Sequence, residues 1–96
     1  MKALKLVVIR TQNAGVFYGA LVKRTGSEAT LNKCRRLWYW KGAASLSQLA
    51  QEGVSAPAEC KFSVPVDGQT VLQVIEVIPV SKAGAKSIDG VPLWRV

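Results

Sequence analysis

Residues 35–53 hold the side chains that are best suited to bind a ligand. Two adjacent arginines open this stretch, and three consecutive aromatic residues follow at positions 38–40. Guanidinium groups pair with phosphate oxygens, and aromatic rings stack on planar groups such as nucleobases. Backbone N–H groups at the start of the helix expected after these aromatics attract anions. We therefore predict a site for an anionic, nucleotide-like ligand, formed by Arg35, Arg36, Trp38, Trp40, Lys41 and Ser45.

The aromatic residues admit two other interpretations. In a strand, Trp38 and Trp40 point to one side and Tyr39 to the other, so only one of these faces can stack on a given ligand. The two tryptophans are alternatively core residues with their indole N–H groups at the sheet edge, or part of a subunit interface. Ser45 is equally well explained as the N-cap of the helix.

The sequence lacks the residues of common catalytic and metal sites. It contains no histidine, which removes the commonest general base and the commonest metal ligand. The six carboxylates are scattered along the chain. Cys34 and Cys60 alone make a poor zinc site, and without an export signal we expect both to be reduced and buried. We therefore predict that the protein is not an enzyme and needs no cofactor or metal.

Positive charge is concentrated in the first half of the chain. The net charge is +7, and residues 1–48 carry nine Lys or Arg residues against one acid, whereas residues 49–96 carry four against five. This asymmetry favours an anionic partner, which includes nucleic acid as an alternative to a small ligand. A net charge away from zero also simply keeps a small protein in solution.

Length and composition predict a single domain over residues 1–96. Hydrophobic residues make up 49% of the 96 residues, which is enough for a core. The apolar runs are far too short to cross a bilayer, and the first residues lack the pattern of a signal peptide. We therefore expect a cytoplasmic protein with no membrane contact.

The first 40 residues predict a β-hairpin followed by a third strand. Residues 2–10 and 16–24 read as strands, joined by a turn in which Gly15 favours a positive φ. Gly19 indicates a bulge or the close approach of another backbone. In the third strand, over residues 29–40, apolar and basic residues occur on both faces, which indicates a bulge or a strand whose two ends face different environments.

A helix is predicted over residues 45–52. Ser45 and Gln48 have capping-box spacing, and Gly53 stands where a left-handed residue ends a helix. This helix has only about two turns, so packing must hold it. A single further helical turn is expected over residues 81–86.

The second half predicts a second hairpin. Residues 59–66 alternate between apolar and polar, Asp67-Gly68 is a two-residue turn signal, and residues 69–80 form a long β-branched strand. Pro65 indicates that the first of these strands lies at an edge or is bulged there. Glu76, flanked by apolar residues, is expected to be a buried or half-buried partner of an arginine.

The order of elements predicts an α+β domain. About five strands form a small antiparallel β-sheet, with one short helix between the third and fourth strands. Two architectures fit this order: an open sheet packed on the helix, and a partly closed β-barrel of the oligonucleotide-binding type.

Four segments resemble a family of short, uncharacterised proteins encoded in phages and prophages. They are RTQNAGVFYG, RRLWYWKGAASLSQLA, CKF and VIEVIP, and the similarity covers residues Val8 to Trp94. The resemblance implies a protein made in the cytoplasm of an infected bacterium. It also implies, by analogy with other small phage proteins, an inhibitor or an oligomeric sponge for nucleotide signals.

Residues and resemblance together lead to three hypotheses. The first is a non-enzymatic, homo-oligomeric phage protein that sequesters an anionic nucleotide-like ligand and so counters host defence. The second is an inhibitor that binds a host protein, or a virion component, through its aromatic strand. The third is a nucleic-acid-binding protein that uses the basic N-terminal half.

Overall fold

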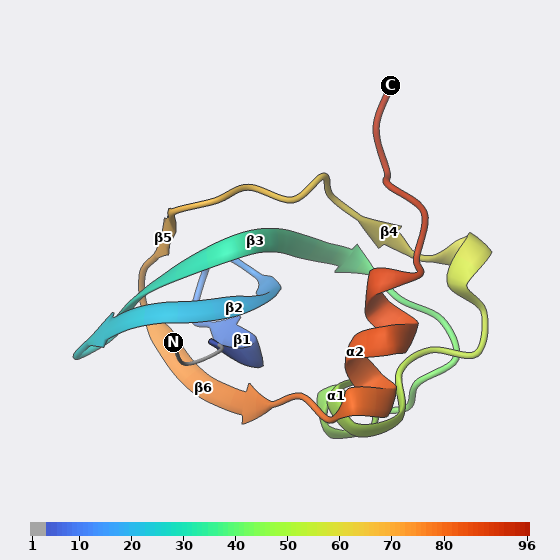
Figure 1. Cartoon of the computed structure of the whole chain (residues 1–96), viewed down its shortest axis with the longest axis horizontal. Coiled ribbons are helices and arrows are strands. Elements are labelled where there is room, and N and C mark those ends of the chain that lie inside the picture. Colours follow the sequence, from blue (N-terminus) through green and yellow to red (C-terminus); the bar gives the residue numbers. More distant parts are fainter. Residues whose placement is uncertain (1–3) are drawn as a thin grey trace.

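The strands of this protein form one antiparallel sheet with the spatial order β4-β3-β2-β1-β6, and β5 pairs with a second part of β3. The computed structural model describes residues 4–96, so Lys2 and Ala3 of the first expected strand lie outside it. Within the described residues the sheet stays open, as one of the two predicted architectures has it (Figure 1). The strands are β1 (Lys5–Thr11), β2 (Val16–Thr25), β3 (Glu28–Tyr39), β4 (Lys61–Phe62), β5 (Gln69–Val71) and β6 (Val74–Pro79).

The first hairpin is confirmed. Strands β1 and β2 pair in antiparallel register around a turn in which Gly15 has φ +100°. The Thr11 hydroxyl donates to the Gly15 carbonyl at 2.8 Å and accepts the Ala14 N–H at 2.9 Å. These bonds satisfy the backbone groups of the turn, which holds Asn13 and Ala14 in place at one end of the sheet.

The predicted bulge in the third strand is also confirmed. The register between β2 and β3 shifts between Tyr18 and Ala20, and Lys33 on β3 has φ +50°. Gly19 lies opposite this bulge, where a Cβ atom would come within 2.9 Å of the Asn32 carbonyl oxygen. Because the bulge adds a residue, it reverses which side chains of β3 face each side of the sheet.

The hairpin predicted at Asp67-Gly68 is wrong. The segment 61–71 runs along β3 throughout, with Cys34 opposite Val66 and the β5 residues opposite 29–31. The Asp67 carboxylate accepts the Lys33 N–H at 2.8 Å, and the Asn32 side-chain oxygen accepts the Gly68 N–H at 2.9 Å. The Asp-Gly pair therefore carries the chain past the β3 bulge, because the bulge leaves backbone and side-chain groups that need partners there.

The long strand expected over residues 69–80 is divided, so the sheet has six strands instead of five. Gln73, with φ +58°, marks the break: β5 pairs with β3 before it and β6 with β1 after it. Glu76 on β6 meets an arginine as expected, since Arg10 Nε lies 3.0 Å from its carboxylate. Of the two expected degrees of burial, the half-buried one holds, because both side chains are about half exposed.

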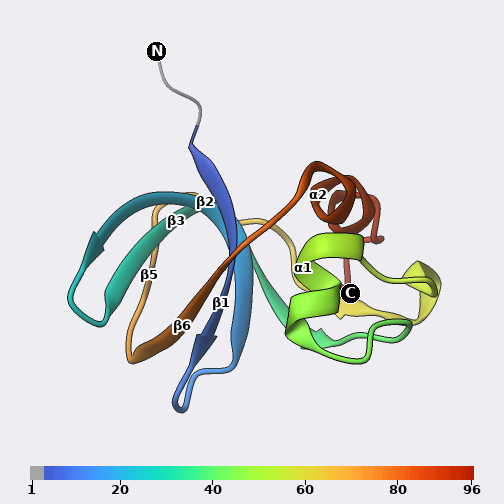
Figure 2. The same ribbon diagram turned by 90° about the horizontal axis from the view of Figure 1, so that it is seen from below.

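Two helices lie side by side at one end of the sheet (Figure 2). In α1 (Leu46–Glu52) the predicted ends are confirmed: Ser45 accepts the Gln48 N–H, and Gly53 has φ +82°. Helix α2 (Lys82–Asp89) replaces the single turn expected there. A short 3₁₀ turn, Pro57–Glu59, precedes β4. Neither helix within residues 4–96 is long and apolar enough to cross a membrane.

The central strands are buried on both faces, and each face has its own core. The helix-side core fills the space between the sheet and the two helices, and the strand-side core lies between the sheet and the β5–β6 segment. Successive residues of β1 enter the two cores in turn, as the alternation of a strand requires. The helix-side core includes Val8, Tyr18, Leu37, Leu49, Phe62 and Ile88; the strand-side core includes Val7, Ile9, Phe17, Leu31, Cys34 and Val71.

We predict that Gly19→Ala destabilises the fold. The added methyl group meets backbone atoms of β3 that cannot move without disturbing the bulge, which should cost about 1–3 kcal/mol in the free energy of unfolding. Urea denaturation measures this cost. Val22→Ala, an exposed position on the same strand, should change stability by less than about 0.5 kcal/mol. Equal effects of the two changes would contradict the close approach at Gly19.

We also predict a loss of stability at alkaline pH that depends on Cys34. Burial raises the pKa of the Cys34 thiol to about 12, so the folded protein keeps a proton that the unfolded chain releases above about pH 9. The contribution of the Cys34 thiol to the free energy of unfolding is therefore complete below about pH 9. It falls by about 1.4 kcal/mol per pH unit between about pH 9 and about pH 12. Denaturation curves at several alkaline pH values should show a shallower decline for Cys34→Ala. Parallel declines would contradict the prediction.

Candidate functional site

Arg35 lies in the interior, where carbonyl groups take up its hydrogen-bond donors. Its side chain is 4% exposed, and the guanidinium donates five hydrogen bonds of 2.8–3.3 Å. A group that is buried and satisfied in this way cannot reach a ligand without unfolding its surroundings. Arg35 therefore has a structural role and is not part of the ligand site predicted from the sequence. The acceptors are the carbonyls of Phe62, Ser63, Ile88, Val91 and Pro92.

Among residues 4–96, the surroundings of Arg35 compensate its charge without a direct ion pair. Ile88 lies in the last turn of α2, where helix carbonyls carry partial negative charge. Burial lowers the pKa of Arg35, and the nearby Asp89 carboxylate opposes this shift. Asp89 also accepts the Tyr18 hydroxyl at 2.9 Å, and burial followed by this hydrogen bond raises the pKa of Tyr18. Tyr18, Arg35 and Asp89 together join β2, β3 and α2 on the helix side of the sheet.

Arg36 points to the opposite side of the sheet and is held between two aromatic rings. Its guanidinium carbon lies 5.3 Å from the ring centre of Phe17 and 4.4 Å from that of Trp38. One Nη donates to the Ala14 carbonyl in the first turn. Within residues 4–96 this carbonyl is its one hydrogen-bond acceptor, so the remaining guanidinium N–H groups are available to a ligand. Stacking fixes the orientation of those donors.

Aromatic and cationic side chains continue from Arg36 across the surface. The rings of Trp38 and Trp94 lie 6.1 Å apart at 65°, and Lys61 Nζ lies 5.5 Å from the centre of the Trp94 ring. Trp38 is 55% exposed and Trp94 is 47% exposed, so both indoles can contact a partner. We call this set, formed by Phe17, Arg36, Trp38, Trp94 and Lys61, the aromatic–cation row.

Lys61 and Trp94 were not predicted as site residues. Lys61 gave only the signal of a polar residue in an alternating strand. Trp94, with Pro92 and Leu93 beside it, was expected only to lie against the sheet or a neighbouring subunit, and the first of these is what the structure has. The structure places both residues at the site because the backbone N–H of Trp94 donates to the carbonyl of Phe62 in the edge strand β4, at 2.9 Å. This pairing lays the tail across the sheet edge next to Trp38.

Two other predicted residues contribute less than expected. Trp40 packs against the helix-side core while also lining a hollow beside Trp38. Ser45 caps α1 through its bond with the Gln48 N–H, which is the alternative interpretation given for it. A helix of seven residues capped in this way offers no ligand site at its start.

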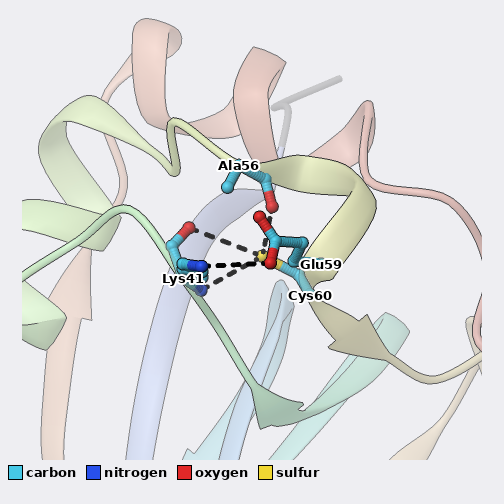
Figure 3. Close-up of polar contacts among 4 residues, drawn as sticks. All are labelled: Lys41, Ala56, Glu59 and Cys60. Atoms are coloured by element: carbon cyan, nitrogen blue, oxygen red, sulfur yellow. Dashed lines mark hydrogen bonds and ion pairs between the residues drawn. The ribbon is translucent and has the colours of Figure 1, made fainter.

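Lys41 is engaged at the surface by a carboxylate. Its Nζ lies 3.0 Å from Glu59, and this hydrogen bond, followed by the attraction between the charges, raises the pKa of Lys41 (Figure 3). The Lys41 N–H also points at the sulfur of Cys60, 3.4 Å away, and that sulfur lies 3.5 Å from the Ala56 carbonyl oxygen. Lys41 thus ties the end of β3 to the 3₁₀ turn, and much of its charge is already balanced.

Two hollows flank Arg36. The first, about 380 Å³, lies between the first turn and the end of β3 and is lined by residues 13–16, Arg36, Leu37, Trp38 and Trp40; we call it the aromatic hollow. The second, about 510 Å³, is lined by Asn13, Ala14, Phe17, Arg36 and residues 69–73; we call it the amide hollow because it contains Asn13, Gln69 and Gln73. Both volumes fall in the range of roughly 300–1,000 Å³ that is typical of small-ligand sites.

The side chains of this surface are of types that suit the binding of planar or anionic groups. The surface offers guanidinium and ammonium donors, exposed indole rings and carboxamides, all of which hold planar or anionic groups without reacting. The part of the chain that the structure describes contains no group of three or more Cys, Asp or Glu side chains that could hold a metal ion. Both cysteines are free and buried, in different cores.

Comparison with known proteins identifies one family. The sequence model of the family described as "Domain of unknown function (DUF6948)" matches residues 4–88, so the chain belongs to this family. The match contains Arg36, Trp38 and both hollows, and it ends before Trp94. Searches of curated proteins and of solved structures give no match to the chain.

We predict that the two adjacent arginines differ strongly in their effect on stability. Arg35→Met takes a hydrogen-bond donor away from several buried carbonyls and should cost about 3 kcal/mol or more. Arg36→Met removes stacking and one hydrogen bond at a partly exposed site and should cost about 1–2 kcal/mol. Urea denaturation measures both, with the exposed Arg24→Met as the control. Equal costs at positions 35 and 36 would contradict the structural role of Arg35.

Proposed function

We propose that this chain, as a member of that family, is a non-enzymatic binding protein that captures an anionic nucleotide-like ligand. One observation carries the proposal: a guanidinium held between two aromatic rings, with free N–H groups beside an exposed indole and two hollows. Such a donor is oriented before the ligand arrives, so binding loses little side-chain entropy. The proposed setting is the cytoplasm of a bacterium that carries a phage.

The phosphate of the ligand would bind the free N–H groups of Arg36. Charge-assisted hydrogen bonds of this kind contribute about 1.5–3 kcal/mol. The base would stack on the exposed indole of Trp38 inside the aromatic hollow, and base–aromatic stacking contributes about 1–3 kcal/mol. Lys61 beside Trp94 adds positive charge at the far end of the row. Sequestration needs only this binding, because a bound ligand is withheld from other receptors without being chemically changed.

A second candidate function is favoured by the apolar surface around the row. Tyr39 is 49% exposed and Leu93 is 47% exposed, and they adjoin the exposed Trp38 and Trp94 in the sequence. Aromatic residues of this kind are enriched in protein interfaces. This surface would serve an inhibitor of a host protein, a virion component, or contact between subunits of a homo-oligomer.

We predict that nucleotides raise the melting temperature of the protein and that this shift depends on the row. Trp38→Ala removes the stacking surface and should weaken binding about tenfold or more. Arg36→Lys keeps the charge but loses the planar fork of donors, and we expect a similar loss. Thermal shift over a panel of mononucleotides and dinucleotides, followed by calorimetry, measures both changes.

Arg24→Lys is the matched control, since Arg24 is exposed on β2 and belongs to neither hollow. It should leave the response unchanged. A protein that responds to no nucleotide in the panel contradicts the proposal, and capture of a bacterial protein that depends on Trp38 and Leu93 then supports the second candidate. Binding to single-stranded nucleic acid that weakens steeply with salt would instead support the basic half as a nucleic-acid surface.

A further inference from the structure

Arg36 forms part of the wall of both hollows. Asn13 and Ala14 of the first turn are shared in the same way, so the two hollows meet along these three residues. The Ala14 carbonyl holds one side of the guanidinium, which leaves its other N–H groups at this border. An anion bound there would have space on either side of it.

The two hollows differ in chemistry. The aromatic hollow offers indole rings, which stack on a base of any kind. In the amide hollow, the Asn13 side-chain N–H donates to the Gln73 side-chain oxygen at 3.2 Å. This bond leaves the Asn13 side-chain oxygen free to accept and the Gln73 side-chain N–H groups free to donate, in two carboxamides that touch each other. Adjacent donors and acceptors of this kind match the edge of a nucleobase.

The backbone at Gln73 supports a role for its side chain. Gln73 has φ +58°, a conformation that glycine adopts freely and other residues adopt at a cost. A carboxamide is nevertheless present there, at the point where β5 passes into β6. The Gln73 carbonyl accepts the Gln12 N–H at 3.0 Å, so the backbone is anchored to the first turn independently of the side chain.

We infer that the ligand is a pair of nucleotide units joined by one phosphodiester. The phosphodiester lies at Arg36, one base stacks on Trp38 in the aromatic hollow, and the other base is bound through its edge by Asn13 and Gln73 in the amide hollow. The inference rests on the proposed function and deepens it, because it names the ligand class from the chemistry on each side of Arg36. A mononucleotide would fill only one of the two hollows.

The test compares adenosine monophosphate with the dinucleotide adenylyl-(3′→5′)-adenosine by calorimetry. The dinucleotide should bind about tenfold more tightly or better, since it contacts both hollows. Gln73→Gly removes the carboxamide and relieves the backbone, so the variant should fold. It should reduce dinucleotide affinity to the level of the mononucleotide and leave mononucleotide affinity unchanged. Lys33→Gly, at the other non-glycine residue with positive φ in the described part of the chain, is the matched control and should change neither.

The outcomes separate this inference from the proposed function. Equal affinities for the two probes, with no effect of Gln73→Gly, overturn the two-unit ligand and leave nucleotide binding intact. Absence of binding to either probe overturns both. A decamer of oligoadenylate identifies the source of the unit: affinity equal to that of the dinucleotide indicates a free dinucleotide, and tighter binding that falls with salt indicates a single strand. Both of these decamer results support the paired unit.

Discussion

The buried guanidinium of Arg35 is the interaction on which the rest of this structure depends. Its five hydrogen bonds reach carbonyls of β4, of the residue after it, of the last turn of α2 and of the segment that follows α2. A cation in the interior is costly unless its donors are satisfied and negative charge lies near. The C-terminal end of α2 and the adjacent Asp89 supply that charge. One side chain of β3 thereby holds the edge of the sheet, a helix and the tail in a single arrangement.

The position of Arg35 also determines the candidate site. Neighbouring residues of a strand face opposite sides, so an inward Arg35 places Arg36 on the other face of the sheet, between Phe17 and Trp38. Two of the five bonds hold the segment Val91–Pro92, which brings Trp94 to the edge of β4 and against Trp38. Arg35 holds these elements together in the interior, and the aromatic–cation row lies on their exposed side. A stable interior and a pre-oriented surface arise from two consecutive arginines with opposite roles.

Features that depend on a few neighbouring residues could be read from the sequence. The first hairpin, both ends of α1 and the bulge in the third strand follow from turn chemistry, capping side chains and broken alternation, all of which act over short stretches of chain. The Asp67-Gly68 turn shows where this approach ends. The dipeptide is a strong local turn signal, yet its side chain and backbone pair with Asn32 and Lys33 of a bulge 34 to 36 residues away, and the chain continues along the same strand. An analysis of neighbouring residues cannot predict that pairing with a distant segment will prevail over a local hairpin.

The sequence by itself determined the materials of this protein: an antiparallel α+β domain, a basic first half, and a group of arginine and tryptophan residues suited to planar anions. Tertiary structure decided how each of them is used. Arg35 and Arg36 are chemically identical, and burial separates them only after β3, α2 and the tail have packed together. Asn13 and Gln73 are 60 residues apart and meet because β6 pairs with β1. Their roles depend on contacts between distant segments, whereas composition and local pattern record only the side chains available for those contacts.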